Sequence, residues 1–214
     1  LETRIFTKFD RITLFSKNEA AKVKKIYKNK VFQIDESVNN VVNKFSFSKF
    51  NNKVLFIGNL NYLPNLLACK DFINNILPKL KKRIPKIKFC IIGSISNLNN
   101  FFLKKPNVEI LGTKKNLSKY IKNSFCGLAN LQIATGVQGK VLTYMSYGLP
   151  VICSKKVAEN FGINVLTYSK NSDLIEKIIS LKESKTKSNV LSKKSFKYSK
   201  SLIWKKINKK YFQI

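Results

Sequence analysis

Short apolar runs rich in β-branched and aromatic residues recur along the chain, each followed by a polar or amphipathic segment. Runs of this length, bounded by glycine, proline or asparagine, are typical of strands buried on both faces. Strands that alternate with helical segments at spacings of roughly 20 to 35 residues indicate βαβ units. We therefore expect an α/β fold, with a parallel sheet covered by helices. The expected strands span 11–15, 53–58, 88–93, 107–111, 125–131, 150–154 and 164–168.

The segments between these runs carry helical periodicity. In 64–82 the apolar residues recur at intervals of three and four and form one stripe, with lysines on the other face. Pro64 suits the first helical turn, and Pro85 ends the segment. The pattern repeats in 171–181, and 185–212 is predicted to form one or two basic helices. Six anchors should hold these helices to the body: Phe196, Leu202, Ile203, Trp204, Ile207 and Tyr211.

The first 52 residues differ from the rest in organisation. Residues 1–33 are predicted to form a separate β–α–β piece, and 34–52, rich in Asn and Ser, is predicted to connect it to the main sheet, which begins near Lys53. The chain opens with Leu1, and its first ten residues lack the basic-then-apolar layout of a signal peptide. No run of about 18 apolar residues is present to span a membrane. We expect the chain to be part of a longer protein.

The chain carries 41 Lys and Arg against 11 Asp and Glu, a formal charge of +30. Almost all of the positive charge is lysine, whereas nucleic-acid binders commonly rely on arginine for bidentate contacts. Three interpretations stay open: a compositional bias, attraction to anionic lipid or phosphate, and nucleic-acid binding. We favour the first and expect no nucleic-acid partner. The most basic stretch, from Lys182 onward, is the one suited to peripheral contact with an anionic membrane.

The four cysteines are widely spaced, and the chain has no histidine. A zinc site would need close cysteine pairs or histidines. Three of the cysteines lie in or beside apolar runs, where the residue behaves as a small buried hydrophobe. We therefore expect no metal site, no disulfide and no cofactor, and a reducing, cytoplasmic setting that includes the inner membrane face.

Several expected strands end in glycine followed by a small polar residue. Gly58 and Asn59 end one strand, Gly93 ends the next, and Gly112 with Thr113 ends a third. Glycine at such a position lets a ligand approach the backbone, although glycine also ends many strands for turn geometry alone. Three on successive strands of one sheet favour a ligand site at this edge. The spacing is not the dinucleotide fingerprint GxGxxG.

The most informative segment is ATGVQGKVLTYMSYGLPVICS, residues 134–154. A loop of small residues with Gly136 runs into a helix that should begin near Gln138 or Lys140 and end at Gly148. The loop and the helix N-terminus offer N–H groups to an anion, and Lys140 adds a positive charge in the first turn. The alternative is a solvated lysine in a lysine-rich protein. Thr143 lies on the same helix, one turn further on.

This segment resembles the donor-binding helix of GT-B glycosyltransferases of family four, and the resemblance extends along nearly the whole chain. FIGNLNYLPNLLACKDFINNILPKLKKRIPKIKFCIIG is similar to the first strand, helix and second strand of the family's Rossmann-like C-terminal domain. NVEILGTKKNLSKYIKNS matches its third strand and the following helix, and LETRIFTKFDRITLFSKNEA is similar to the end of its N-terminal domain. The closest subgroup is that of bacterial exopolysaccharide and cell-surface sugar transferases.

The resemblance implies a division into three parts and a function. Residues 1–50 would end an N-terminal domain, 51–184 would bind a nucleotide sugar, and 185–214 would form a basic helical segment. The protein would transfer a sugar from a nucleoside diphosphate to a glycan or lipid-linked acceptor, in polysaccharide or cell-envelope synthesis, with no bound metal. The implied donor-binding residues are Gly58, Asn59, Gly93, Thr113, Gly136, Val137, Gln138, Lys140 and Thr143.

Two departures from the family pattern leave alternatives open. The family commonly carries a Glu-x7-Glu pair, which here corresponds to Thr135 and Thr143; the second Glu is expected to hold the ribose hydroxyls. The linker 34–40 (IDESVNN) lacks the family's Pro-Asn-Gly. A non-catalytic descendant that acts as a binding or assembly subunit is therefore the main alternative, and a basic nucleic-acid-binding protein is a further one. The sequence names no catalytic residue, nor the nucleotide, sugar or acceptor.

Overall fold

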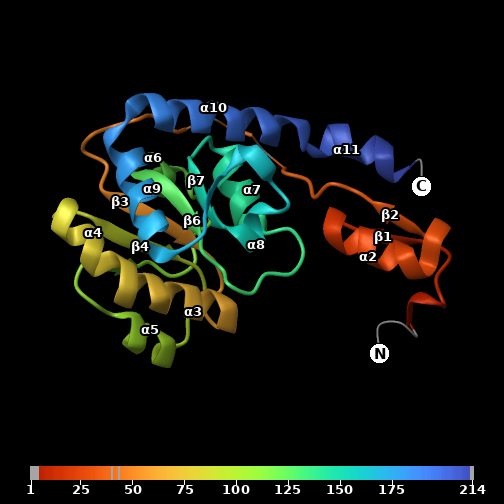
Figure 1. The fold of residues 1–214 in the computed structure, drawn as a ribbon, viewed down its shortest axis with the longest axis horizontal. Coiled ribbons are helices and arrows are strands. Elements are labelled where there is room, and N and C mark those ends of the chain that lie inside the picture. Colours follow the sequence, from red (N-terminus) through yellow and green to blue (C-terminus); the bar gives the residue numbers. More distant parts are fainter. Residues whose placement is uncertain (1–4, 40, 43, 213–214) are drawn as a thin grey trace.

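The computed structural model describes residues 5–39, 41–42 and 44–212, and its centre is a six-stranded sheet (Figure 1). Every strand pairing in the sheet is parallel, in the order β5-β4-β3-β6-β7-β8. The predicted α/β class is confirmed, and each predicted strand is present. The predicted strand at 11–15 lies in the N-terminal part described below. The six strands of the sheet are β3 (Lys53–Ile57), β4 (Lys88–Ile92), β5 (Val108–Ile110), β6 (Ser124–Ala129), β7 (Val151–Ser154) and β8 (Leu166–Tyr168).

The strand order places a topological switch point between β3 and β6. From β3 the chain proceeds outward to β4 and β5, then returns to β6 and proceeds the other way to β7 and β8. In open parallel sheets the loops at such a point diverge from the carboxyl ends of the two strands and leave room for a ligand. The segments that diverge here are 58–62, after β3, and 130–138, after β6.

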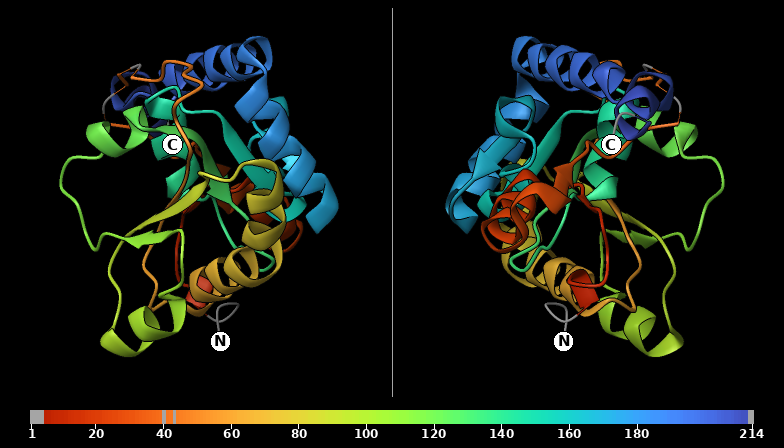
Figure 2. Two further views of the ribbon diagram at one scale, coloured as in Figure 1. Left: turned by 90° about the vertical axis from the view of Figure 1, so that its left-hand side faces the viewer. Right: turned by 90° about the vertical axis from the view of Figure 1, so that its right-hand side faces the viewer.

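Helices cover both faces of the sheet. The helical stretch of α3 (Leu63–Asp71), the π-helical turn η2 (Phe72–Ile76) and α4 (Leu77–Arg83) packs with α9 (Asn171–Glu183), while α7 (Gly139–Ser146) packs with α10 (Lys185–Ser201). Figures 1 and 2 show α10 on one side of the sheet and α3 on the other. Shorter elements complete the body: α5 (Asn97–Leu103), α6 (Ser118–Lys122), α8 (Lys155–Ala158), the 3-10 turn η3 (Gly162–Asn164) and α11 (Trp204–Tyr211).

The helix over 64–82 differs from its prediction in one respect. Pro64 occupies the first turn and the helix ends at Arg83, as predicted, but the regular pattern is interrupted by η2. Pro78 explains the interruption, because proline has no N–H to donate to the carbonyl of Asn74 in a regular helix. The wide turn keeps Phe72, Ile73 and Ile76 in the core.

The core is continuous between the two helical layers. All four cysteines lie in it as free thiols, and burial raises the pKa of each, that of Cys90 to about 11. Such thiols stay protonated and behave as small hydrophobic side chains, as predicted for three of the four.

The N-terminal part forms a small unit of its own, as predicted. It consists of β1 (Ile12–Leu14), α2 (Lys17–Tyr27), the 3-10 turn η1 (Lys28–Lys30) and β2 (Val31–Gln33), and its two strands pair in parallel. The connector that follows runs along α7, where the N–H groups of Val42 and Phe45 donate to the carbonyls of Ser146 and Tyr147. Figure 1 shows the unit beside the body, below α11.

Helix α10 approaches the body through a stripe of serines. These residues are buried and recur at intervals of three and four: Ser188, Ser192, Ser195 and Ser199. Their small size permits close packing, and Ser199 Oγ lies 3.2 Å from the carbonyl oxygen of Met145 in α7. None of the described helices combines the length and the hydropathy that a membrane span requires.

The predicted C-terminal anchors are confirmed only in part. Leu202 and Ile207 are buried, but Trp204 is 45 % exposed, so its prediction as an anchor was wrong. Ile203 is extended, which ends α10 and resets the helical phase for α11. Phe196 and Ile203 are half-buried, and the side chain of Tyr211 lies outside the described part.

Candidate functional site

Lys140 lies in the first turn of α7, and its ammonium group points back toward the end of β3. Its Nζ lies 2.5 Å from Asn65 Oδ1 and 4.0 Å from the ring centroid of Phe56. Burial lowers the pKa of Lys140 to about 8. None of the four ion pairs among the described residues includes Lys140. A poorly hydrated cation at the positive end of a helix, with no carboxylate partner, is stabilised by an anionic ligand.

Asn65 links Lys140 to the turn after β3. Its Nδ2 donates to the carbonyl of Asn59 at 2.9 Å, while its Oδ1 accepts from Lys140. Asn59 Oδ1 in turn accepts from the N–H of Asn61 and from Ser94 Oγ, which ties the turn to the segment after β4. The ammonium is therefore held by a fixed carboxamide on α3. Asn65 is not among the predicted site residues, because it stands next to Pro64 in a stretch whose pattern indicates only a helix.

Two of the predicted site residues, Gly58 and Gly93, lie so close to neighbouring atoms that a side chain does not fit there. A Cβ on Gly58 would lie 2.9 Å from Asn65 Nδ2 and 3.1 Å from Lys140 Nζ, so any side chain there would displace both. A Cβ on Gly93 would lie 1.8 Å from the carbonyl oxygen of Gly58, and Gly93 also has a φ of +154°. The structure thus brings Gly58, Asn59, Gly93 and Lys140 together. Thr113 is exposed on the loop after β5, directly after Gly112, whose carbonyl accepts from the N–H of Gly93 at 3.1 Å.

The loop 134–138 is held from two sides at Gly136. Its N–H donates to Glu19 Oε1 of the N-terminal unit at 2.7 Å, and its carbonyl accepts from Asn160 Nδ2 at 3.1 Å. Gly136 has a φ of +64°, in the left-handed region that favours glycine. Gln138 stabilises the same loop through Nε2, which donates to the carbonyl of Thr135 at 3.0 Å, and Val137 is half-buried beside it.

A second carboxylate, that of Glu36 in the connector, reaches the N-terminus of α7. Its Oε1 lies 3.5 Å from the position that a Cβ on Gly139 would take, and burial raises the pKa of Glu36. Carboxylates at a helix N-terminus interact favourably with the helix dipole. Neither contact has a signal in the sequence, because Glu19 and Glu36 are brought to the loop by the arrangement of the unit and the connector.

Thr143 and Tyr144 follow on α7 with different roles. Thr143 Oγ1 donates to the carbonyl of Gly139 at 2.9 Å, one turn back, so its proton is engaged within the helix. Tyr144 is fully buried, and its hydroxyl lies between β3 and β6: it accepts from the N–H of Ile57 at 2.7 Å and lies 3.2 Å from the carbonyl of Leu55. The hydroxyl also lies 3.3 Å from the carbonyl of Leu128, so it bridges the carboxyl ends of β3 and β6.

The part of the chain that the structure describes offers no cluster with metal-ligand chemistry. Among the described residues, no three Cys, Asp or Glu side chains gather closely enough to hold a metal ion. What the arrangement provides is one buried ammonium and the N–H groups of the first turn of α7, while the N–H of Gly136 in the preceding loop is engaged by Glu19. This combination can bind an anionic group and stabilise negative charge that develops on it.

The chain matches one family model and several solved structures. The family model described as glycosyl transferases group 1 matches residues 51–184. A search of curated proteins found no match. A variant of TarM from S. aureus, in complex with fondaparinux, alpha-GlcNAc-glycerol and UDP, superposes with a TM-score of 0.77 at 15 % identity, over 97 % of this chain and 44 % of TarM.

Two further solved structures share the fold. HepE of Anabaena, in complex with UDP and glucose, has a TM-score of 0.74 at 11 % identity and covers 95 % of this chain and 62 % of HepE. The pneumococcal O-GlcNAc transferase GtfA, in complex with UDP and GlcNAc, has a TM-score of 0.67 at 13 % identity. The match covers 97 % of this chain and 45 % of GtfA. The chain therefore spans less than two thirds of the length of each.

Proposed function

Since the chain belongs to the glycosyl transferases group 1 family, we propose that it binds the diphosphate of a nucleotide sugar at the carboxyl ends of β3 and β6. The complete protein then transfers the sugar to a glycan or lipid-linked acceptor. In this proposal 1–50 is the end of an N-terminal domain with its linker, 51–184 is the donor-binding domain, and 185–214 is a basic helical segment. UDP is the first nucleotide to test, because TarM, HepE and GtfA are each solved with UDP.

The observation that carries the proposal is the environment of Lys140. Its ammonium is buried enough to lower its pKa, lies in the first turn of a helix, and has a carboxamide partner but no carboxylate. Burial, the position in the first helical turn and the lack of a carboxylate partner each destabilise the charged form of Lys140. A bound diphosphate offsets all three effects. The alternative of a solvated surface lysine is hard to reconcile with the contacts to Asn65 and Phe56.

The roles of the neighbouring residues follow from their positions. Gly58 and Asn59 allow the diphosphate to approach the backbone after β3, while Gly136, Val137 and Gln138 line the diphosphate and sugar. When the bond to the sugar breaks, the departing nucleoside diphosphate gains a negative charge. Lys140 and the N–H groups of the first turn of α7 stabilise that charge without rearranging, which lowers the barrier. Gly93 and Thr113 lie toward the base and ribose.

The alternative of a non-catalytic binding or assembly subunit is favoured by one observation. Thr143 stands where the resemblance places a ribose-binding Glu, and its hydroxyl proton is engaged with Gly139. A neutral hydroxyl in place of a carboxylate weakens a buried contact by about 1–3 kcal/mol, or roughly ten- to a hundredfold in affinity. A protein with this loss can still bind the donor. Measuring turnover by the complete protein therefore distinguishes a glycosyltransferase from a non-catalytic subunit.

The lysines of α10 support a further part of the proposal, peripheral contact with an anionic membrane from the cytoplasmic side. Lys193, Lys194, Lys197 and Lys200 are exposed, on the face opposite the buried serines. Each lysine near an anionic surface contributes about 1 kcal/mol of attraction. Co-sedimentation with vesicles containing anionic lipid should exceed that with neutral vesicles and should fall with added salt.

Thermal melting tests donor binding directly. The chain is melted with UDP, GDP and ADP and with their sugars, in parallel with Lys140→Met, which keeps the aliphatic stem and removes the charge. Lys82→Ala, at an exposed position on α4, is the matched control for lost positive charge. A ligand that binds only the folded chain raises the melting temperature.

The proposal predicts that one nucleotide raises the melting temperature of the wild type and of Lys82→Ala but not of Lys140→Met. Flat curves with every nucleotide contradict donor binding by this chain. Equal shifts in the wild type and in Lys140→Met place the nucleotide elsewhere. A salt-sensitive response to oligonucleotides alone supports the nucleic-acid alternative.

A further inference from the structure

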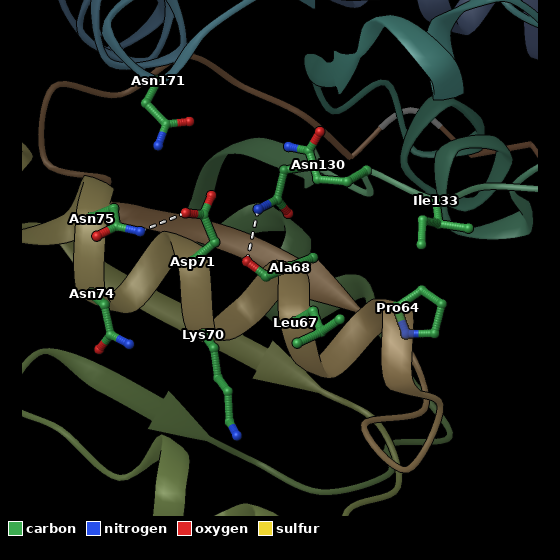
Figure 3. Close-up of a pocket in the computed structure, with 11 residues that line it drawn as sticks. Pro64, Leu67, Ala68, Lys70, Asp71, Asn74, Asn75, Asn130, Ile133 and Asn171 are labelled. Atoms are coloured by element: carbon green, nitrogen blue, oxygen red, sulfur yellow. Dashed lines mark hydrogen bonds between the residues drawn. The ribbon is translucent and has the colours of Figure 1, made fainter.

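A second pocket lies on the outer side of α3, away from Lys140. It has a volume of about 500 Å³ and is bounded by α3 and η2, by the segment directly after β6, and by Asn171 at the start of α9 (Figure 3). The helices on either side come from distant parts of the chain. None of the residues placed in the donor site lines it.

The lining is dominated by carboxamides, although the chain is rich in lysine. Five amide side chains line the pocket: Asn74, Asn75, Asn130, Gln132 and Asn171. Lys70 also borders it, but Figure 3 shows this side chain extending away from Asn130 and Asn171, and its Nζ lies 5.0 Å from the ring centroid of Phe102. The groups that face the pocket are therefore mostly uncharged donors and acceptors.

Two acceptors in the pocket retain binding capacity. Asp71 Oδ1 accepts from Asn75 Nδ2 at 2.7 Å, and Asp71 takes part in none of the described ion pairs. Asn130 is 1 % exposed; its Nδ2 donates to the carbonyl of Ala68 at 2.8 Å, but its Oδ1 is buried without a partner among the described residues. A buried acceptor left unpaired is costly, and a hydroxyl donor relieves that cost.

The mouth of the pocket has an apolar side. Leu67 is 49 % exposed and Ile133 is 66 % exposed, both beside the amides. Hydroxyl groups suit carboxamides and a carboxylate, and the C–H face of a sugar ring suits exposed aliphatic side chains. A phosphate would need cations, and a base would need an aromatic surface; none of the lining residues is aromatic. We propose that this pocket binds an uncharged sugar unit of a glycan.

The position of the pocket relates it to the donor site. Pro64 on its rim precedes Asn65, which holds Lys140, and the segment 130–133 leads into the loop 134–138. A glycan seated here contacts two segments that also support the donor site, and in the proposed function it is the acceptor glycan. That identity rests on the proposed function, whereas binding of a neutral sugar does not.

Side-chain amide resonances provide a direct test. The isotope-labelled chain is titrated with the methyl glycosides of glucose, galactose, mannose and N-acetylglucosamine, and the NH2 signals of the five lining amides are followed. At least one glycoside should shift them saturably. Asp71→Ala should lower the affinity for that glycoside at least tenfold. Asp10→Ala, which removes an exposed carboxylate of the N-terminal unit, should leave the affinity unchanged. An unchanged backbone spectrum shows that each variant is folded.

Three results overturn the proposal: no glycoside shifts these signals, Asp71→Ala binds as tightly as the wild type, or UDP shifts the same amides as strongly as the sugar does. The last result assigns the pocket to the nucleotide. Failure here is distinct from failure of the proposed function, because nucleotide binding is measured separately through Lys140→Met.

Discussion

The carboxylate of Glu19 accepts a hydrogen bond of 2.7 Å from the N–H of Gly136, across 117 residues of sequence. The contact is reinforced nearby, where Asn18 Nδ2 donates to Glu159 Oε2 at 3.0 Å and Asn160 Nδ2 donates to the Gly136 carbonyl. The N-terminal unit is thus attached to the loop that precedes α7. Any movement of this unit relative to the sheet must change the support of the loop.

We expect Glu19→Ala to loosen the loop without unfolding the chain. A charge-assisted hydrogen bond in this half-buried setting contributes about 1–2 kcal/mol, so exchange of the Gly136 amide hydrogen should accelerate roughly 5- to 30-fold. Hydrogen exchange followed by NMR measures this. Glu183→Ala, which removes an exposed carboxylate at the end of α9, should leave the rate unchanged, and equal rates in wild type and Glu19→Ala would contradict the prediction.

Lys140 should lower the stability of the free chain at neutral pH. Its pKa is about 8 when folded, below the ordinary value of 10.5, so the unfolded state binds more protons between these values. Stability therefore rises with pH over this interval, and below pH 8 the full penalty, about 3 kcal/mol at most, is present. Urea denaturation should show Lys140→Met to be more stable than wild type at pH 7, with a gap that narrows toward pH 10. A constant gap would exclude this titration.

Much of the fold could be predicted because it depends on local pattern. Strands buried on both faces need continuous apolar runs such as 53–58, and Gly136 and Lys140 stand out because a glycine loop before a helix is a local signal. The candidate site could be predicted to the extent that it consists of such strand ends and helix starts. Gly58 and Gly93 belong to this class.

What escaped prediction depends on distant segments or on helical phase. Glu19 and Glu36 become neighbours of the loop only after the connector has folded back, and Asn65 becomes a partner of Lys140 only once α3 and α7 meet at the switch point. Helical periodicity predicted that Trp204 would face the core. The prediction failed because periodicity does not reveal the extended residue, Ile203, that precedes α11. Tertiary geometry decides these contacts.

The two glycines after β4 and β5 should respond differently to alanine. Both have positive φ, but a Cβ on Gly112 meets no atom within 4 Å, whereas one on Gly93 meets the Gly58 carbonyl oxygen at 1.8 Å. Gly112→Ala should therefore lose about 1 kcal/mol from backbone strain alone, and Gly93→Ala roughly 3 kcal/mol or more. Chemical denaturation compares them, and similar losses would show that the close approach is relieved by a small backbone shift.

Affinity for a nucleoside diphosphate should fall above pH 8. The anion favours protonated Lys140, and the free chain loses that proton near its pKa of about 8. Affinity should change little near pH 7, fall to about half at pH 8, and then decline by up to roughly tenfold per pH unit, because binding must first restore the proton. Isothermal titration of the nucleotide that binds in the melting experiment measures the profile. Lys140→Met should bind weakly with a flat profile, and a sloping profile in that variant would assign the titration to another group.

Thr143→Glu should tighten nucleotide binding if Thr143 faces the ribose. The substitution ends the hydrogen bond to the Gly139 carbonyl and places a carboxylate on the same face of α7, where it can accept from two hydroxyl groups. A charged hydrogen bond of this kind contributes about 1.5–3 kcal/mol, so affinity for UDP should rise roughly ten- to a hundredfold. Thr143→Gln, whose side chain is as long as that of Glu but uncharged, should raise the affinity for UDP less. The affinity of Thr143→Glu for the 2′,3′-dideoxy nucleotide should not rise above that of the wild type. Equal gains for both nucleotides would show that the new carboxylate acts elsewhere, and weaker binding of UDP would mean that position 143 faces the diphosphate.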